Sequence, residues 1–107
     1  MTARERLLNR RYSETFDFEA AGLRYTATVS RFPDGRIGEV FLNNHKSNSA
    51  ADTNARDSAI VFSIAVQHGA DPEVIRRALC RHADGSASGP LGAALDLIAV
   101  RPFRTEP

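Results

Sequence analysis

The stretch from Phe41 to Gly69 reads FLNNHKSNSAADTNARDSAIVFSIAVQHG and predicts a strand end, a polar loop and a long helix. From Ala59 onward this helix is apolar on almost every side, so we expect it to be buried in a core. Ser49 can cap its first turn, with Asp52 three residues further on, and Gly69 can end it in a left-handed conformation. The stretch therefore predicts a mixed fold in which a helix packs against a sheet.

Three segments before the helix have the patterns of strands. Residues 15–20 and 23–32 alternate between apolar and polar side chains, and Ala21-Gly22 can form the tight turn between them. Pro33-Asp34-Gly35 is a further turn signal, and residues 37–42 follow as a third strand. Because this third strand is the most apolar, we expect it to be central in the sheet.

Two shorter helices follow the long one. Asp71, Pro72 and Glu73 are an N-cap, a first-position proline and an acidic first turn. In this second helix we expect apolar residues to be buried and arginines to face solvent: Val74, Ile75, Ala78 and Leu79 against Arg76, Arg77 and Arg81. A third helix opens at Gly89-Pro90 and runs through Ile98. The predicted fold class is α+β, a three-stranded antiparallel meander packed against three helices in the order β-β-β-α-α-α.

Length and composition predict one domain. The 107 residues carry a net charge of +1, which does not indicate nucleic acid as a partner. We expect residues 1–12 to be a basic, loosely ordered arm, 13–100 the α+β domain, and 101–107 a frayed tail. The single cysteine, Cys80, excludes an internal disulfide, is expected in the core and fits a cytoplasmic protein. No apolar run is long enough to cross a membrane.

Candidate binding residues gather where the polar loops meet the helix ends. Seven polar loop residues before the long helix exceed what one cap requires, although Asn, Ser and Asp also favour turns, and Arg56 can pair with Asp52 one turn away. The small residues from 83 to 92 can expose backbone N–H groups to an anion, or can instead allow two helices to pack closely. The candidate ligand- or partner-binding residues are Asn43, Asn44, His45, Lys46, Asp52, Asn54, Arg56, Asp57, Ser86, Ser88 and Gly89.

The sequence predicts neither a catalytic nor a metal-binding residue. The spacing of His45, His68 and His82 matches no zinc pattern, and no serine lies in a nucleophile motif. We therefore expect no metal ion and no cofactor.

Three motifs resemble a known family. They are Asp34-Gly35 in a turn, Gly38-Glu39-Val40-Phe41-Leu42 in a strand, and Ser63-Ile64-Ala65-Val66-Gln67-His68-Gly69 at a helix end. In this order they resemble a TSCPD-like domain near the C-terminus of vitamin B12-dependent (class II) ribonucleotide reductases, which also has small free-standing bacterial versions.

The resemblance implies kinship with a reductase and not its activity. Ribonucleotide reduction uses a radical-forming thiol and a redox-active cysteine pair, whereas this chain has one cysteine and no catalytic barrel. It also lacks the Thr-Ser-Cys-Pro-Asp string that names the domain. The resemblance therefore predicts a non-catalytic accessory or protein-interaction module, with a larger enzyme chain as a partner. The alternative is a domain that binds or senses a small anionic ligand such as a nucleotide. Self-association through a strand edge or the first helix stays open as well.

Overall fold

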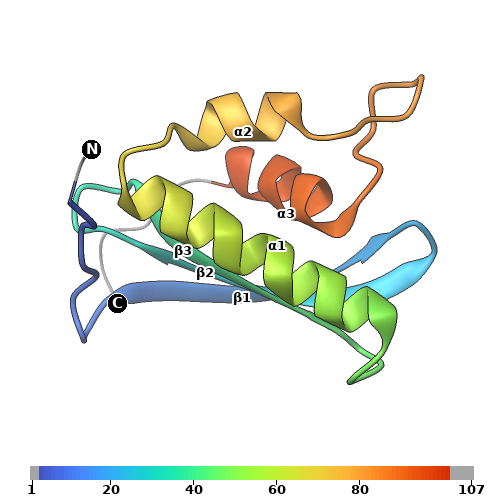
Figure 1. Cartoon of the computed structure of the whole chain (residues 1–107), viewed down its shortest axis with the longest axis horizontal. Coiled ribbons are helices and arrows are strands. Elements are labelled where there is room, and N and C mark those ends of the chain that lie inside the picture. Colours follow the sequence, from blue (N-terminus) through green and yellow to red (C-terminus); the bar gives the residue numbers. More distant parts are fainter. Residues whose placement is uncertain (1–2, 102–107) are drawn as a thin grey trace.

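The computed structural model describes residues 3–101, in which three strands are followed by three helices (Figure 1). The elements are β1 (Tyr12–Ala20), β2 (Leu23–Arg31), β3 (Ile37–Asn44), α1 (Ala50–Gln67), α2 (Pro72–Ala78) and α3 (Pro90–Ala99). All three helices lie on one side of the sheet (Figure 1). The predicted α+β fold is confirmed.

The sheet is a meander of order β1-β2-β3 with antiparallel neighbours. The central strand is β2, so the expectation that the third strand is central was wrong. Strand β3 lies at an edge, and it is apolar because α1 packs closely along it. Val40 and Leu42 are 0% and 1% exposed.

The core lies between one face of the sheet and the helices. Its cluster includes Phe18, Tyr25 and Val29 from β1 and β2, Phe62 from α1, and Leu95 from α3. The other face of the sheet is polar and its hydroxyl groups pair across the strands. Thr15 and Thr28 are 3.0 Å apart at their hydroxyl oxygens, and Ser13 and Ser30 are 2.8 Å apart. One buried face and one polar face are the usual arrangement of an antiparallel sheet covered on one side.

Helix α1 has the caps that the sequence predicts but is not buried all round. The Ser49 hydroxyl accepts from the Asp52 N–H, and Gly69 has a φ of 100°. Its outer side chains Ile60, Val61 and Ile64 are 50%, 67% and 41% exposed. The three-stranded sheet covers only one side of the helix, so the apolar residues on the opposite side face solvent.

Helix α2 also differs from the prediction. The Asp71 cap is confirmed, since its carboxylate accepts from the Glu73 N–H, but no residue of α2 is fully buried. Ile75 packs against the core, whereas Val74 is 64% exposed. Arg76, expected in solvent, turns instead toward α3.

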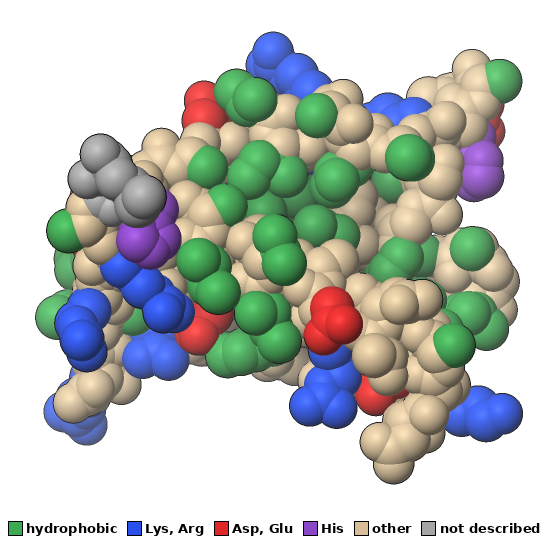
Figure 2. All heavy atoms as spheres, viewed as in Figure 1, with side chains coloured by type: hydrophobic (Ala, Val, Ile, Leu, Met, Phe, Trp, Pro, Cys, Tyr) green, Lys and Arg blue, Asp and Glu red, His purple; other side chains and the backbone are tan. Residues whose placement is uncertain are grey.

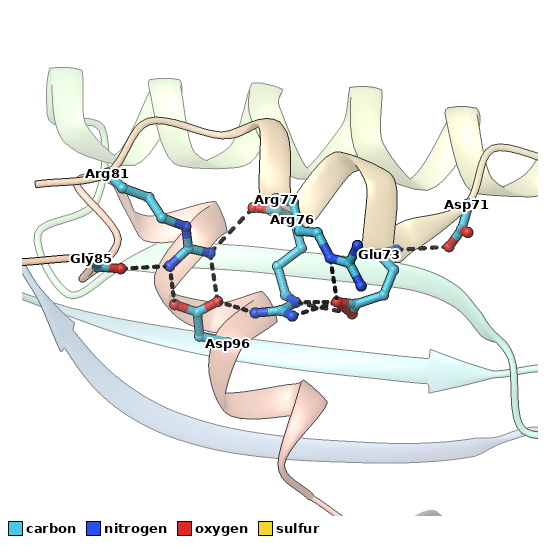
Figure 3. A network of polar contacts seen from close by, with 7 residues as sticks. All are labelled: Asp71, Glu73, Arg76, Arg77, Arg81, Gly85 and Asp96. Atoms are coloured by element: carbon cyan, nitrogen blue, oxygen red, sulfur yellow. Dashed lines mark hydrogen bonds and ion pairs between the residues drawn. The ribbon is translucent and has the colours of Figure 1, made fainter.

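Arg76 turns toward α3 because an acidic residue lies there, and the helical pattern of residues 72–79 gives no indication of it. Asp96 accepts from Arg76 Nη1 at 2.9 Å and from both terminal nitrogens of Arg81 at 2.8 Å (Figure 3). Arg76 also binds Glu73, and Arg81 donates to the Gly85 carbonyl. This network fixes α2 and the loop after it to α3.

Both ends of the described chain contact the domain. Arg101 pairs with Glu14 at 2.8 Å and lies 4.5 Å from the centre of the Phe16 ring. Residues 3–11 form no helix or strand, yet the Glu5 N–H donates to the Gln67 carbonyl at 2.7 Å. The division into an arm, a domain and a tail stays a prediction, and residues 1–2 and 102–107 lie outside the described part.

Candidate functional site

The polar loop between β3 and α1 is held by a buried carboxylate. Asp52 is 3% exposed and accepts hydrogen bonds from the backbone N–H groups of Asn44, at 2.9 Å, and Asn48, at 3.2 Å. The Asn44 N–H is the main reason that the pKa of Asp52 lies below its ordinary value, and the Asn48 N–H and Arg56 add to it. Asp52 therefore closes the loop onto the first turn of α1.

Other polar residues of the loop are also used within it. The Ser49 hydroxyl donates to the Lys46 carbonyl at 2.7 Å. Asn43 and Asn44, expected in the loop, are instead the last residues of β3, and the Asn44 side-chain oxygen accepts from the Lys46 N–H at 2.8 Å. Asn48 takes a positive φ of 62°, which Asn tolerates. Turn and cap bonds thus engage Asp52 and the side-chain oxygen of Asn44, whereas the Asn44 side-chain nitrogen is buried without a hydrogen-bond partner among the described residues.

The remaining residues of the first cluster divide between two surfaces. Asn43 and Arg56 line a hollow of about 200 Å³ together with Phe41, Leu42 and Ile60. Arg56 lies 3.7 Å from Asp52, and Lys46, Asn54 and Asp57 are exposed.

His45 points elsewhere. Its Nε2 lies 3.0 Å from the Thr26 hydroxyl and 3.8 Å from the Asp17 carboxylate, on the polar face of the sheet. The structure therefore does not bring His45 together with Arg56.

The second cluster lies in the loop before α3, and its Gly89 lies near Asn54 and Ser58 of α1. Ser86 binds Asp84 within its own turn, and the Ser88 N–H donates to the Cys80 carbonyl at 3.0 Å. Gly89 caps α3 without a side-chain hydrogen bond. A pocket of about 240 Å³ opens here, lined by Asn54, Ser58, Leu79, Cys80, Gly89, Pro90, Leu91 and Gly92.

This pocket joins the two predicted clusters, because Asn54 comes from the first and Gly89 from the second. Leu79, Pro90 and Leu91 make its lining mainly apolar, which suits an apolar side chain better than an anion. Cys80, expected in the core, is exposed at its rim.

Sequence reasoning missed the apolar outer surface of α1 and α2. It consists of Ile60, Val61 and Ile64 of α1 and Val74 of α2, all at least 41% exposed. Figure 2 shows hydrophobic side chains gathered over α1 and in the hollow between α1 and α2. The signal was present in the sequence: a helix that is apolar all round needs two apolar neighbours, and one small sheet supplies only one.

The motif residues of β3 and α1 contact one another. Ser63 bonds both the N–H and the carbonyl of Val40, at 2.9 and 3.1 Å, and Gln67 Nε2 donates to the Gly38 carbonyl at 2.7 Å. These bonds satisfy backbone groups on the edge of β3 that faces away from β2. The motifs are therefore residues that hold the fold together.

Two classes of site are absent from the described part of the chain. Residues 3–101 contain no group of three His, Cys, Asp or Glu side chains that could hold a metal ion. None of the helices in that range is long and apolar enough to cross a membrane.

Fold and site define a small α+β domain with an exposed apolar helix surface, and comparison with curated proteins points to one class of enzyme. The chain is 36% identical to the vitamin B12-dependent ribonucleotide reductase of Agrobacterium fabrum over 66 residues, which are 62% of this chain and 5% of that protein. The enzyme of Rhodopirellula baltica is 39% identical over 72 residues, 67% of this chain and 7% of the relative. That of Bradyrhizobium diazoefficiens is 30% identical over 69 residues, 64% of this chain and 6% of the relative.

These matches confirm the resemblance to vitamin B12-dependent ribonucleotide reductases. The chain corresponds to a small part of them, between 5% and 7% of their length. No protein-family model matches the chain, and no solved structure matches it either.

Proposed function

We propose that this domain is a non-catalytic, TSCPD-like accessory module that docks onto a larger protein of the ribonucleotide reductase type. The observation that carries the proposal is the apolar outer surface of α1 and α2, where Val61 is 67% and Val74 is 64% exposed. An apolar patch on a small soluble domain commonly marks a contact with another protein.

The pocket beside this surface supports the same proposal. Ser58 lines the pocket and lies three residues before Val61, so both project from one side of α1. A partner that packs on Val61 can therefore insert an apolar side chain between Leu79 and Leu91. Apolar anchors seated in pockets are typical of the contacts that dominate binding energy.

The similarity to reductases supports the choice of partner. In those relatives the matching segment is joined to a chain many times longer, which offers a surface for the outer side of α1. Catalysis by this domain alone has no support, because the chain holds one cysteine whereas ribonucleotide reduction requires several thiols.

The alternative, a nucleotide site built on Lys46 and Arg56, has weaker support. The Asp52 carboxylate already binds the N–H groups of Asn44 and Asn48 at the start of α1. An anion at this end of the helix would lie against that negative charge.

The proposal is tested by placing a photo-crosslinking amino acid at position 61 in cells that express the chain. We expect a crosslinked product that mass spectrometry identifies as a ribonucleotide reductase chain. The matched control carries the same amino acid at Thr15, on the polar face of the sheet, and should give no such product.

Two results would contradict the proposal. Crosslinking of the chain to itself at position 61 would mean that a second copy covers the surface. Equal products from positions 61 and 15 would mean that the surface has no specific partner.

A further inference from the structure

The segment before β1 folds back over the ends of β3 and α1. The Glu5 N–H donates to the Gln67 carbonyl, and the Glu5 carboxylate binds both terminal nitrogens of Arg36, at 2.9 and 3.0 Å. Leu7 packs on Gly38 so closely that a Cβ added there would lie 2.5 Å from Leu7 Cδ2. The glycine of the strand motif thus leaves room for this segment.

A pocket of about 370 Å³ lies between this segment and the domain. Its lining consists of Arg4, Glu5, Arg6, Leu7, Arg11, Glu39 and Gln67. Of the three hollows described, it has the largest volume. Its lining is mostly charged side chains, whereas the lining of the pocket beside α3 is mainly apolar.

The charges in the pocket do not balance. Three arginines and two glutamates line it. Glu5 pairs with Arg36, which lies outside the lining and also pairs with Asp34, and Glu39 is paired with Arg11 at 3.2 Å. This leaves Arg4 and Arg6 without a carboxylate partner among residues 3–101. Two guanidinium groups therefore remain for an anion.

One of these guanidinium groups is held in place. Gln67 is 5% exposed, and its amide nitrogen is bound to the Gly38 carbonyl. Its side-chain oxygen accepts from Arg4 Nε at 2.5 Å, and both terminal nitrogens of Arg4 have no hydrogen-bond acceptor among residues 3–101. A guanidinium fixed through Nε can offer its remaining fork of donors to two oxygens of one ligand.

We propose that this pocket binds a phosphoryl group, with Arg4 and Arg6 as its ligands. A phosphoryl group presents several anionic oxygens, which matches two guanidinium groups better than a single carboxylate does. Inorganic phosphates and the phosphates of a nucleotide share this chemistry. This pocket shares no lining residue with the apolar outer surface of α1 and α2. The phosphoryl proposal can therefore be tested independently of the docking proposal.

The test is a calorimetric titration of the full chain with inorganic pyrophosphate at constant ionic strength. Arg6→Gln should weaken binding about tenfold, because one of the two guanidinium groups in the pocket is lost. The matched control is Arg10→Gln, which removes one exposed arginine from the same segment and should change the affinity less than about twofold. Equal losses in both variants would overturn the proposal, since they would show charge attraction without a site, and so would an absence of binding.

A second variant tests the geometry without removing a charge. Leu7→Ala weakens the packing of the segment on Gly38 and should lower the affinity for pyrophosphate while the domain stays folded. An unchanged affinity would contradict the pocket as the site. A nucleoside triphosphate titrated in parallel identifies the source: equal affinity means that phosphates alone are bound, and tighter binding means that the nucleoside is contacted too.

Discussion

The Ser63 hydroxyl accepts a hydrogen bond from the N–H of Val40 and donates one to the carbonyl of the same residue. A helix side chain thus takes the place that a neighbouring strand would occupy at the edge of β3. Gln67 does the same for the Gly38 carbonyl, and Asp52 for the Asn44 N–H. Because unpaired strand edges invite association with other chains, α1 both completes the core and protects this edge.

Replacing Ser63 by alanine should therefore destabilise the domain. The N–H and carbonyl of Val40 would be buried without partners, and we expect the free energy of unfolding to fall by about 1–3 kcal/mol. Ser58→Ala is the control, because Ser58 bonds the Ala55 carbonyl of its own helix and no other described residue, and it should cost less than about 0.5 kcal/mol. Urea denaturation measures both, and equal losses would contradict the role of Ser63 as an edge cap.

Alanine substitutions of Asp52 and Arg56 should have very different effects on the melting temperature, although the two side chains lie 3.7 Å apart. Asp52→Ala removes the acceptor of two backbone N–H groups and should lower the melting temperature by several degrees. Arg56→Ala should leave it almost unchanged, because the Arg56 side chain is 56% exposed and exposed ion pairs contribute little. A large loss in Arg56→Ala would mean that the ion pair, and not the backbone contacts, holds the loop.

Asp96 should make stability depend on pH in the acid range. Hydrogen bonds from Arg81 first, and from Arg76 next, lower its pKa from 3.8 to about 2. A carboxyl whose pKa is lower in the folded state stabilises above its unfolded pKa, and this contribution is lost as the pH falls through the folded value. The difference in unfolding free energy between the wild type and Asp96→Asn should therefore shrink between about pH 5 and about pH 2. A difference that stays constant over this range would contradict the assignment.

Substitutions of two adjacent residues of α1 should have very different effects on the free energy of unfolding. Phe62 is 2% exposed in the core, so Phe62→Ala should cost about 3–5 kcal/mol of unfolding free energy. Val61 is 67% exposed, so Val61→Ser should change stability by less than about 0.5 kcal/mol. The Val61→Ser protein stays folded but has an altered outer surface, so it can also be used to measure the contribution of Val61 to partner binding. A marked loss of stability in Val61→Ser would show that its side chain is covered within the domain.

Local patterns were sufficient for the elements and their order. Alternation in residues 15–20 and 23–32 indicates the first two strands, although β1 begins three residues earlier than predicted, at Tyr12. The caps at Ser49 and Asp71 place two helix starts within a residue. The arrangement of the elements was harder to predict. An apolar third strand is equally compatible with a central strand and with an edge strand that a helix covers.

The candidate site was predicted only in part for the same reason. A run of Asn, Ser and Asp is typical both of binding loops and of turns, and only the positions of Asp52 and Asn44 show that they close the loop. The direction of Arg76 depends on Asp96, twenty residues away in the chain. Such a partner has no signal in the helical pattern around Arg76 itself.

The fold class follows from the sequence alone, because periodicity, caps and turn residues act over a few neighbouring positions. It also carried the resemblance to vitamin B12-dependent ribonucleotide reductases, whose motif residues are those that join β3 to α1. Contacts in the folded chain set which side of α1 stays exposed, where the segment before β1 lies, and which arginines have no carboxylate partner among residues 3–101. These properties depend on contacts between residues far apart in the chain, such as Leu7 with Gly38 and Arg4 with Gln67.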